Sequence, residues 1–132
     1  MSRRLLADLL DRNDDHVASL SSDALSAHRD GQRPPVVSVC CSDSRVSQEG
    51  MWEADPGYLF TVGNIGNRVT AAVDGEQMLS GSVAYPLCHT DTGVVAVVGH
   101  TGCGAVGATL DAARDGTFPT DPGVRSHVAE LL

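Results

Sequence analysis

The chain has 132 residues, of which 42% are hydrophobic and 20% charged, and its formal net charge is −8. The length is that of one domain, and this composition supports a packed core, which excludes an intrinsically disordered chain. No apolar run approaches the roughly 20 residues that span a bilayer, and an acidic chain lacks the basic face that nucleic acids require. We therefore expect neither a membrane nor a nucleic-acid partner.

The charged residues are of few types. All nine basic residues are Arg, and the acidic residues are 13 Asp and four Glu. A Lys-free, Asp-rich composition is typical of proteins from salt-loaded cytoplasms, where dense salt screens the repulsion between like charges. The alternative is codon bias in a GC-rich genome. From this composition we favour a halophilic protein. We also expect it to be cytoplasmic, because Asp8 falls too early for the apolar region of a signal peptide.

Apolar residues at helical spacing predict two helices within the first 30 residues. The Asn13-Asp14-Asp15 run should end the first helix and cap the second, which ends before Gly31. The first helix is indicated by Leu5, Leu6, Leu9 and Leu10, and the second by Val17, Leu20, Ala24 and Leu25.

Three runs rich in apolar and β-branched residues predict strands at 36–40, 58–62 and 94–98. The Pro34-Pro35 pair favours an extended chain before the first strand, and a Pro56-Gly57 turn precedes the second. Because the runs do not alternate with polar residues, we expect strands that are buried on both faces, as in parallel sheets.

Helical patterns lie between and after these strands. Ala72, Leu79, Val83 and Leu87 predict a helix that ends near Pro86, another spans 103–114, and a third includes Val124 and Val128. We predict an α/β fold, a three-layer sandwich with a short central parallel β-sheet flanked by helices. It forms a single domain over 1–132, with N-terminal helices at 1–30, a core at 34–115 and the start of a further C-terminal region at 116–132.

Chemically active side chains follow two of the strands. Cys40-Cys41-Ser42-Asp43-Ser44-Arg45 follows the first strand, and His100-Thr101-Gly102-Cys103-Gly104 follows the third. Sites in parallel sheets form outside the carboxyl ends of the strands, so the two clusters should converge. In a reducing compartment, cysteines more often bind metal or react than form disulfides, and Cys and neutral His are suitable zinc ligands.

Within such a site, Asp43 has two possible roles. It could bind the metal as a fourth ligand, or accept a hydrogen bond from metal-bound water, while Arg45 holds its carboxylate. Each motif alone has a simpler explanation: a buried Cys is usually a small apolar residue, and an Asp-x-Arg pair is often a surface salt bridge. A phosphate-binding turn at 99–104 is disfavoured by the absence of Lys.

Cys41-Ser42-Asp43-Ser44-Arg45-Val46 together with His100-Thr101-Gly102-Cys103-Gly104 resembles the signatures of the β-class carbonic anhydrases, Cys-x-Asp-x-Arg and His-x-x-Cys. The resemblance runs from about Leu5 to Ala113. It implies Zn²⁺ held by Cys41, His100 and Cys103, with Asp43 and Arg45 as the catalytic dyad. The implied reaction is reversible hydration of carbon dioxide to bicarbonate and a proton by zinc-bound hydroxide, in a homodimer or higher homo-oligomer.

The resemblance also implies a substrate pocket. The positions that match it are Gln32, Phe60, Ile65, Tyr85 and Gly104. Gln32 matches an amide that faces the zinc-bound oxygen, and the Gly104 N–H matches a donor near the substrate. Ser38 stands where another branch of the family has a Trp at an inhibitory bicarbonate site, which favours an open, water-bearing zinc site. The other histidines, His16, His28, His89 and His127, are expected to be surface or capping residues.

The chain departs from the family pattern in two places. Gly63-Asn64-Ile65-Gly66-Asn67 lacks the family's leading Arg, which affects the packing of the pocket and part of the interface between subunits. Family members also continue for tens of residues beyond Leu132. Two alternatives to carbon dioxide hydration remain. One is a hydrolase of carbonyl sulfide or carbon disulfide, which would use the same scaffold and zinc site. The other is a non-catalytic zinc-binding remnant, which the missing C-terminal part suggests.

Overall fold

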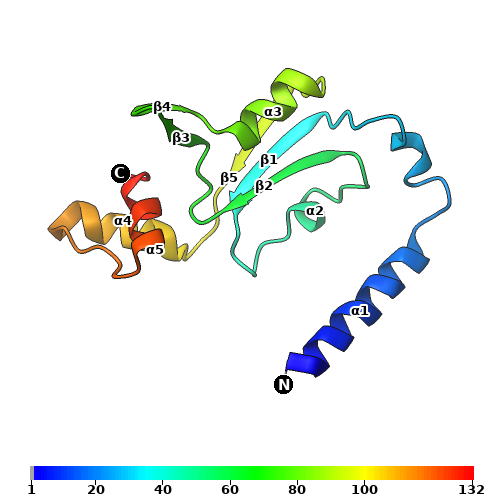
Figure 1. Cartoon of the computed structure of the whole chain (residues 1–132), viewed down its shortest axis with the longest axis horizontal. Helices are drawn as coiled ribbons and strands as arrows, with labels where there is room; N and C mark the ends of the chain where they lie inside the picture. Colours follow the sequence, from blue (N-terminus) through cyan, green and yellow to red (C-terminus); the bar gives the residue numbers. More distant parts are fainter. Residues whose placement is uncertain (1) are drawn as a thin grey trace. The chain divides into compact units, whose positions relative to one another are not determined.

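The computed structural model describes residues 2–132 and contains a parallel three-stranded sheet (Figure 1). Its strands are β1 (Val36–Cys41), β2 (Leu59–Asn64) and β5 (Val94–Val98), in the order β2-β1-β5. The predicted strands are confirmed to within two residues at each end. The register pairs Val39 of β1 with Val62 on one side and Val97 on the other, so the carboxyl ends of β1 and β5 lie side by side.

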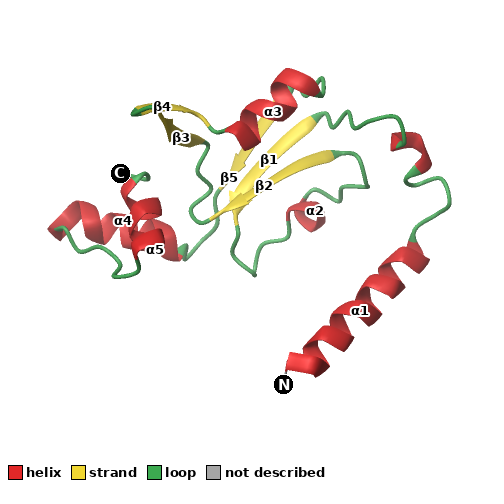
Figure 2. Ribbon diagram, viewed as in Figure 1, coloured by secondary structure: helices red, strands yellow, loops and turns green. Residues whose placement is uncertain are grey.

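Helices and loops flank both faces of this sheet (Figure 2). On one face, Val83 of α3 (Gly81–His89) packs with Val37, Val39 and Val62 of the sheet. Val83, Val37 and Val39 are fully buried. On the other face, the indole N–H of Trp52, which follows the short helix α2 (Gln48–Met51), donates to the Ser38 hydroxyl at 3.1 Å. The predicted α/β class, with a short parallel sheet between helices, is confirmed.

Contacts divide the chain into two compact units, Met1–Gln32 and Arg33–Leu132. The sheet and its helices belong to the second unit. The expected single domain over 1–132, with its subdivision at 30, 34 and 116, stays a prediction. No helix in the described part of the chain is both long enough and apolar enough to cross a membrane.

The first unit holds one long helix where two were predicted. Helix α1 (Ser2–Ser19) continues through Asn13-Asp14-Asp15, and beyond it only a 3₁₀ turn, η1 (Ser26–His28), forms. The predicted helix end was wrong because Asn and Asp cost only a fraction of a kcal/mol each inside a helix, about 0.7 at most. An ion pair of Arg12 with Asp8, one turn apart at 2.8 Å, stabilises the same segment.

A β-hairpin replaces the first part of the helix predicted over Ala72 to Leu87. Strands β3 (Thr70–Val73) and β4 (Glu76–Leu79) pair antiparallel across a two-residue turn at Asp74-Gly75. Both turn residues have positive φ, 51° and 84°. An Asp-Gly pair in this conformation is the preferred hairpin turn, and its geometry overrides the helical spacing of the apolar residues.

The later helices largely follow the prediction. Helix α3 ends at His89 rather than near Pro86, because buried Pro86 lies within it and its carbonyl still accepts from the Thr90 N–H. Helix α4 (Gly104–Asp115) ends on Gly116 in the left-handed conformation. Helix α5 (Pro122–Ala129) begins with Asp121, whose side chain accepts from the Val124 N–H.

Strand β5 differs from the expectation of burial on both faces. Val94, Val95 and Val97 are 54%, 42% and 52% exposed. The strand pairs only with β1 among the described residues, so it forms an edge of the sheet. An uninterrupted apolar run therefore indicates the strand correctly but not its burial within this chain.

Candidate metal centre

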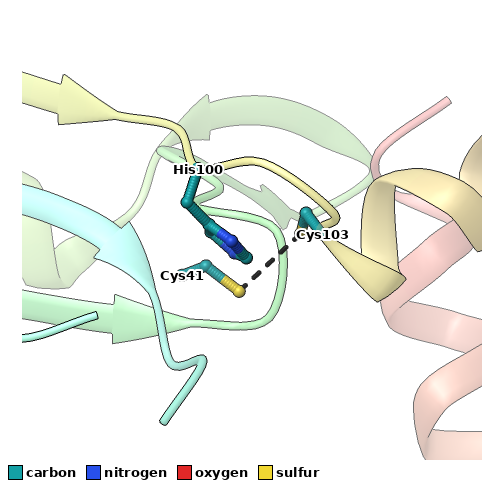
Figure 3. A group of neighbouring side chains, drawn as sticks. All are labelled: Cys41, His100 and Cys103. Atoms are coloured by element: carbon teal, nitrogen blue, oxygen red, sulfur yellow. Dashed lines mark hydrogen bonds between the residues drawn. The ribbon is translucent and has the colours of Figure 1, made fainter. Parts of the chain in front are cut away.

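Three predicted ligand side chains converge at the carboxyl end of the sheet (Figure 3). Cys41 is the last residue of β1, His100 follows β5 by two positions, and Cys103 immediately precedes α4. Their ligand atoms all lie within 4.8 Å of one another, and the two sulfurs are 3.8 Å apart. They meet because neighbouring parallel strands end at the same edge of the sheet.

This cluster fits a zinc ion. Two sulfurs that are each ~2.3 Å from a tetrahedral zinc lie about 3.8 Å from one another, as these two sulfurs do. Nε2 of His100 is buried and has no hydrogen-bond partner within the described residues. Its Nδ1 lies 3.0 Å from the Thr101 carbonyl, a contact that fixes the ring and leaves Nε2 available as a ligand.

The surroundings of Cys41 favour its thiolate. Burial raises the pKa of this thiol, but the Gly66 N–H, the nearby His100, the Asp43 N–H and Cys103 together lower the pKa to about 7. The Cys41 sulfur in turn raises the pKa of His100. Because thiolate sulfur is the form that binds metal, the site is prepared for a cation near neutral pH.

Asp43 lies beside the cluster and is held by Arg45. The guanidinium binds both carboxylate oxygens, Nε to Oδ1 at 2.8 Å and Nη2 to Oδ2 at 2.7 Å, and the Arg45 N–H adds a third bond to Oδ1. These contacts hold the pKa of Asp43 far below its usual range, so the carboxylate is ionised. Nη2 also donates to the Gly102 carbonyl at 3.2 Å, which connects the two predicted clusters.

Asp43 approaches the metal ligands without joining them. Its Oδ2 lies 3.9 Å from Nε2 of His100, beyond hydrogen-bond distance. Both oxygens are already engaged by Arg45. The geometry therefore favours the role of hydrogen-bond acceptor over that of fourth ligand.

The structure brings together part of the predicted substrate pocket. The rings of Phe60 on β2 and Tyr85 on α3 lie 6.0 Å apart between centroids. Ile65 lies on the loop after β2, where its carbonyl is 2.8 Å from Nε2 of His127. Gly104 opens α4, so its N–H belongs to the first turn, where backbone donors have no partner within the helix.

Gln32 is the last residue of the first unit, whereas the metal cluster lies in the second. Its predicted contact with the substrate, and the substrate roles of the other pocket residues, stay predictions.

Sequence reasoning missed one contact of the metal site. Gly66 donates its N–H to Sγ of Cys41 at 3.5 Å from the loop that follows β2. The available signal was the position of this loop, because β2 is the other neighbour of β1 and ends at the same edge. A glycine there, with φ of +85°, can turn its N–H toward the sulfur.

Comparison with known proteins agrees with this geometry. A family model described as carbonic anhydrase matches residues 36–130. The chain is 35% identical over 105 residues to carbonic anhydrase 2 of Mycobacterium tuberculosis, an alignment that covers 80% of this chain and 44% of that protein.

Two solved structures share the fold. The β-carbonic anhydrase CcaA matches with a TM-score of 0.75 at 24% identity, over 98% of this chain and 57% of that one. A tetrameric β-carbonic anhydrase of Sordaria macrospora matches with a TM-score of 0.73 at 18% identity, over 98% and 62% of the two chains.

The family match spans β1, all three metal-ligand positions and α5, which is most of the chain. The chain itself spans less than half the length of the mycobacterial relative. On this match the chain belongs to the carbonic anhydrase family, and its fold is that of the β-carbonic anhydrases.

Proposed function

We propose that this chain binds Zn²⁺ through Cys41, His100 and Cys103 and catalyses the reversible hydration of carbon dioxide to bicarbonate and a proton. The observation that carries the proposal is the convergence of these three side chains beside the ionised, Arg-bound Asp43. Membership of the carbonic anhydrase family supports it. Because the chain spans only 44% of the mycobacterial relative, the activity is proposed for this chain rather than carried over from that protein.

The donor set suits catalysis rather than structure. Three protein ligands are typical of catalytic zinc sites, whereas structural sites have four. A bound zinc ion supplies Lewis acidity, which makes water a nucleophile near neutral pH. Two thiolates and one imidazole hold the cation, and the Nδ1 contact of His100 keeps its ring in place.

Asp43 orients the attacking water. Its carboxylate is ionised and can only accept hydrogen bonds, so a water or hydroxide beside it directs its proton toward Asp43 and a lone pair elsewhere. Arg45 keeps the carboxylate in this position through its two-pronged contact. Without Arg45, Asp43 would be free to turn toward the metal ligands.

The proposed substrate contacts suit a small uncharged molecule. Phe60 and Tyr85 offer apolar surface to carbon dioxide, and Ile65 adds to it. The Gly104 N–H donates a hydrogen bond as negative charge develops on a substrate oxygen.

We further propose that the chain acts as a homodimer or higher homo-oligomer in the cytoplasm. The exposed valines of β5 support assembly, because large apolar side chains at a sheet edge favour association. The Sordaria macrospora protein of the same fold is tetrameric.

The test is an assay of carbon dioxide hydration by the purified, zinc-loaded chain. Proton release during the reaction is measured by stopped flow. We expect turnover that is lost on removal of the metal and restored by zinc. Turnover of carbonyl sulfide or carbon disulfide but not carbon dioxide would instead identify the sulfur hydrolase. Stoichiometric zinc without turnover of any of these gases would identify a non-catalytic zinc-binding protein.

A further inference from the structure

The loop 64–68 links the metal centre to the last helix of the chain. It follows β2 and places the Gly66 N–H 3.5 Å from Sγ of Cys41. Groups that hydrogen-bond to a metal ligand orient it and tune its affinity for the metal. Whatever holds this loop therefore also acts on the Cys41 ligand.

Hydrogen bonds inside the loop fix its shape. The Asn64 side chain accepts from the Arg68 N–H at 2.7 Å and donates to the Arg68 carbonyl at 2.9 Å. Nδ2 of Asn67 donates to the Val98 carbonyl at the end of β5 at 3.1 Å. The loop therefore keeps one shape and is tied to the sheet at Val98, and it also contacts the C-terminal residues of the chain.

Helix α5 and the residues after it contact the same loop at several points. Nε2 of His127 lies 2.8 Å from the Ile65 carbonyl, and Arg68 forms an ion pair with Glu130. Leu131 packs against Gly66 so closely that a Cβ on that glycine would lie 2.7 Å from its Cδ1. Val128, which follows His127 in the chain, is fully buried, and its burial stabilises the position of the helix.

His127 is the central donor of this arrangement. A carbonyl can only accept, so the contact requires a proton on Nε2. The bond joins residues 62 positions apart, and it is directed at the residue immediately before Gly66. Loss of this bond would free the Ile65 carbonyl and with it the peptide unit that carries the Gly66 N–H.

We infer that His127 is a positioning residue for the metal centre: through the Ile65 carbonyl it holds the loop whose Gly66 N–H orients the Cys41 sulfur. The inference rests on the proposed function, in which Cys41 is a metal ligand. His127 acts through the loop and needs no contact with metal or substrate.

The experiment uses cobalt(II) as a spectroscopic probe of the whole chain. Cobalt bound to thiolate gives a sulfur-to-cobalt charge-transfer band that reports on the geometry and charge of the ligand sulfur. We expect His127→Ala to raise the cobalt dissociation constant about tenfold, the lower end of the effect for groups outside the ligand set, and to shift the band. His127→Gln keeps an N–H donor within similar reach and should restore both.

Arg125→Ala is the matched control. Arg125 lies on the same helix, and its guanidinium carbon lies over the Phe118 ring, 4.9 Å from the ring centroid. Its loss should leave the affinity and the band unchanged. If His127→Ala does not fold, His127→Phe, which keeps a ring of similar size but has no N–H donor, is judged by the same criteria.

The outcomes separate the two claims. If the unmodified chain binds no cobalt, the metal site and the inference both fail. If it binds cobalt and His127→Ala leaves affinity and band unchanged, only the inference is overturned. It is also overturned if His127→Gln is as impaired as His127→Ala, or if Arg125→Ala is equally impaired, because the effect would then reflect general loss of the helix.

Discussion

Asp43 is held in place by three hydrogen bonds from a single neighbouring residue. Both of its oxygens accept from the Arg45 guanidinium, and Oδ1 also accepts from the Arg45 N–H. This arrangement keeps the carboxylate ionised and separate from the metal ligands. Its proposed task is to orient water, and the proposed metal ligands are Cys41, His100 and Cys103.

Replacement of Asp43 by Ala should therefore abolish most hydration activity without loss of zinc. We expect kcat to fall by about 100-fold, within the range that a positioned acceptor contributes. Arg45→Ala should reduce activity similarly, because the freed carboxylate can turn toward the metal. Release of zinc by Asp43→Ala would show that Asp43 is a fourth ligand and that the site is closed.

The pH dependence of metal binding follows from the thiol and imidazole. The pKa of Cys41 is lowered to about 7 and that of His100 is raised. Protons and metal compete for both groups, so apparent zinc affinity should fall as the pH drops through about 7. Titration against a chromophoric chelator would measure this. The Cys41 pKa itself is checked by the thiolate absorbance of the metal-free chain, compared with that of Cys41→Ser, and a Cys41 thiolate that forms only near the ordinary thiol pKa of about 8.5 would contradict the lowered pKa.

The two clusters that contain the proposed ligands could be predicted from the sequence because each lies at the end of a clear strand and parallel strands end at one edge. The choice of Cys41, His100 and Cys103 came from the resemblance to the β-class carbonic anhydrases. Gly66 and His127 could not be predicted. The Gly66 contact depends on the left-handed conformation of a loop, and His127 reaches a carbonyl 62 positions away. No local pattern of residue types encodes either contact.

At the scale of elements, β1 and β5 were predictable and the β3–β4 hairpin was missed. Uninterrupted Val-rich runs identify the two strands, since few other structures accommodate so many β-branched residues. The hairpin carries its own signal in Asp74-Gly75, but the spacing of Ala72 and Leu79 also fits a helix. A two-residue turn with both φ angles positive decides between them.

Burial differs sharply between paired strand residues. Val39 on β1 is fully buried, whereas its register partner Val97 on β5 is 52% exposed. We expect Val39→Ala to lower the free energy of unfolding by about 2 kcal/mol, from two lost methyl groups and the cavity they leave. In the monomer, where Val97 is exposed, Val97→Ala should change it by less than about 0.5 kcal/mol, and by more in the proposed oligomer if β5 is covered there. Urea unfolding of both variants checks this, and equal losses would indicate that β5 is covered by a second copy of the chain.

At the scale of the whole molecule, charge is the dominant feature. The chain has seventeen acidic residues and nine arginines, and it has no Lys. Repulsion among the acidic groups opposes the compact state when salt is dilute. The Debye length falls from about 10 Å at 0.1 M to about 3 Å at 1 M salt, so concentrated salt should relieve most of it.

We therefore expect the melting temperature to rise steeply between dilute and molar potassium chloride. Thermal melts across a salt series, followed by circular dichroism, would measure it. The same series with sodium chloride controls for effects specific to potassium. A melting temperature that stays flat across this range would remove the halophilic interpretation and leave codon bias as the origin of the composition.

The zinc content of two matched cysteine variants tests the metal centre most directly. Cys103 lies in the cluster with Cys41 and His100, whereas Cys88 is exposed on α3. Measured by elemental mass spectrometry after purification, the unmodified chain and Cys88→Ser should each carry one zinc ion per chain, and Cys103→Ser should lose most of it. Equal zinc content in the two variants would contradict the assignment of the metal site.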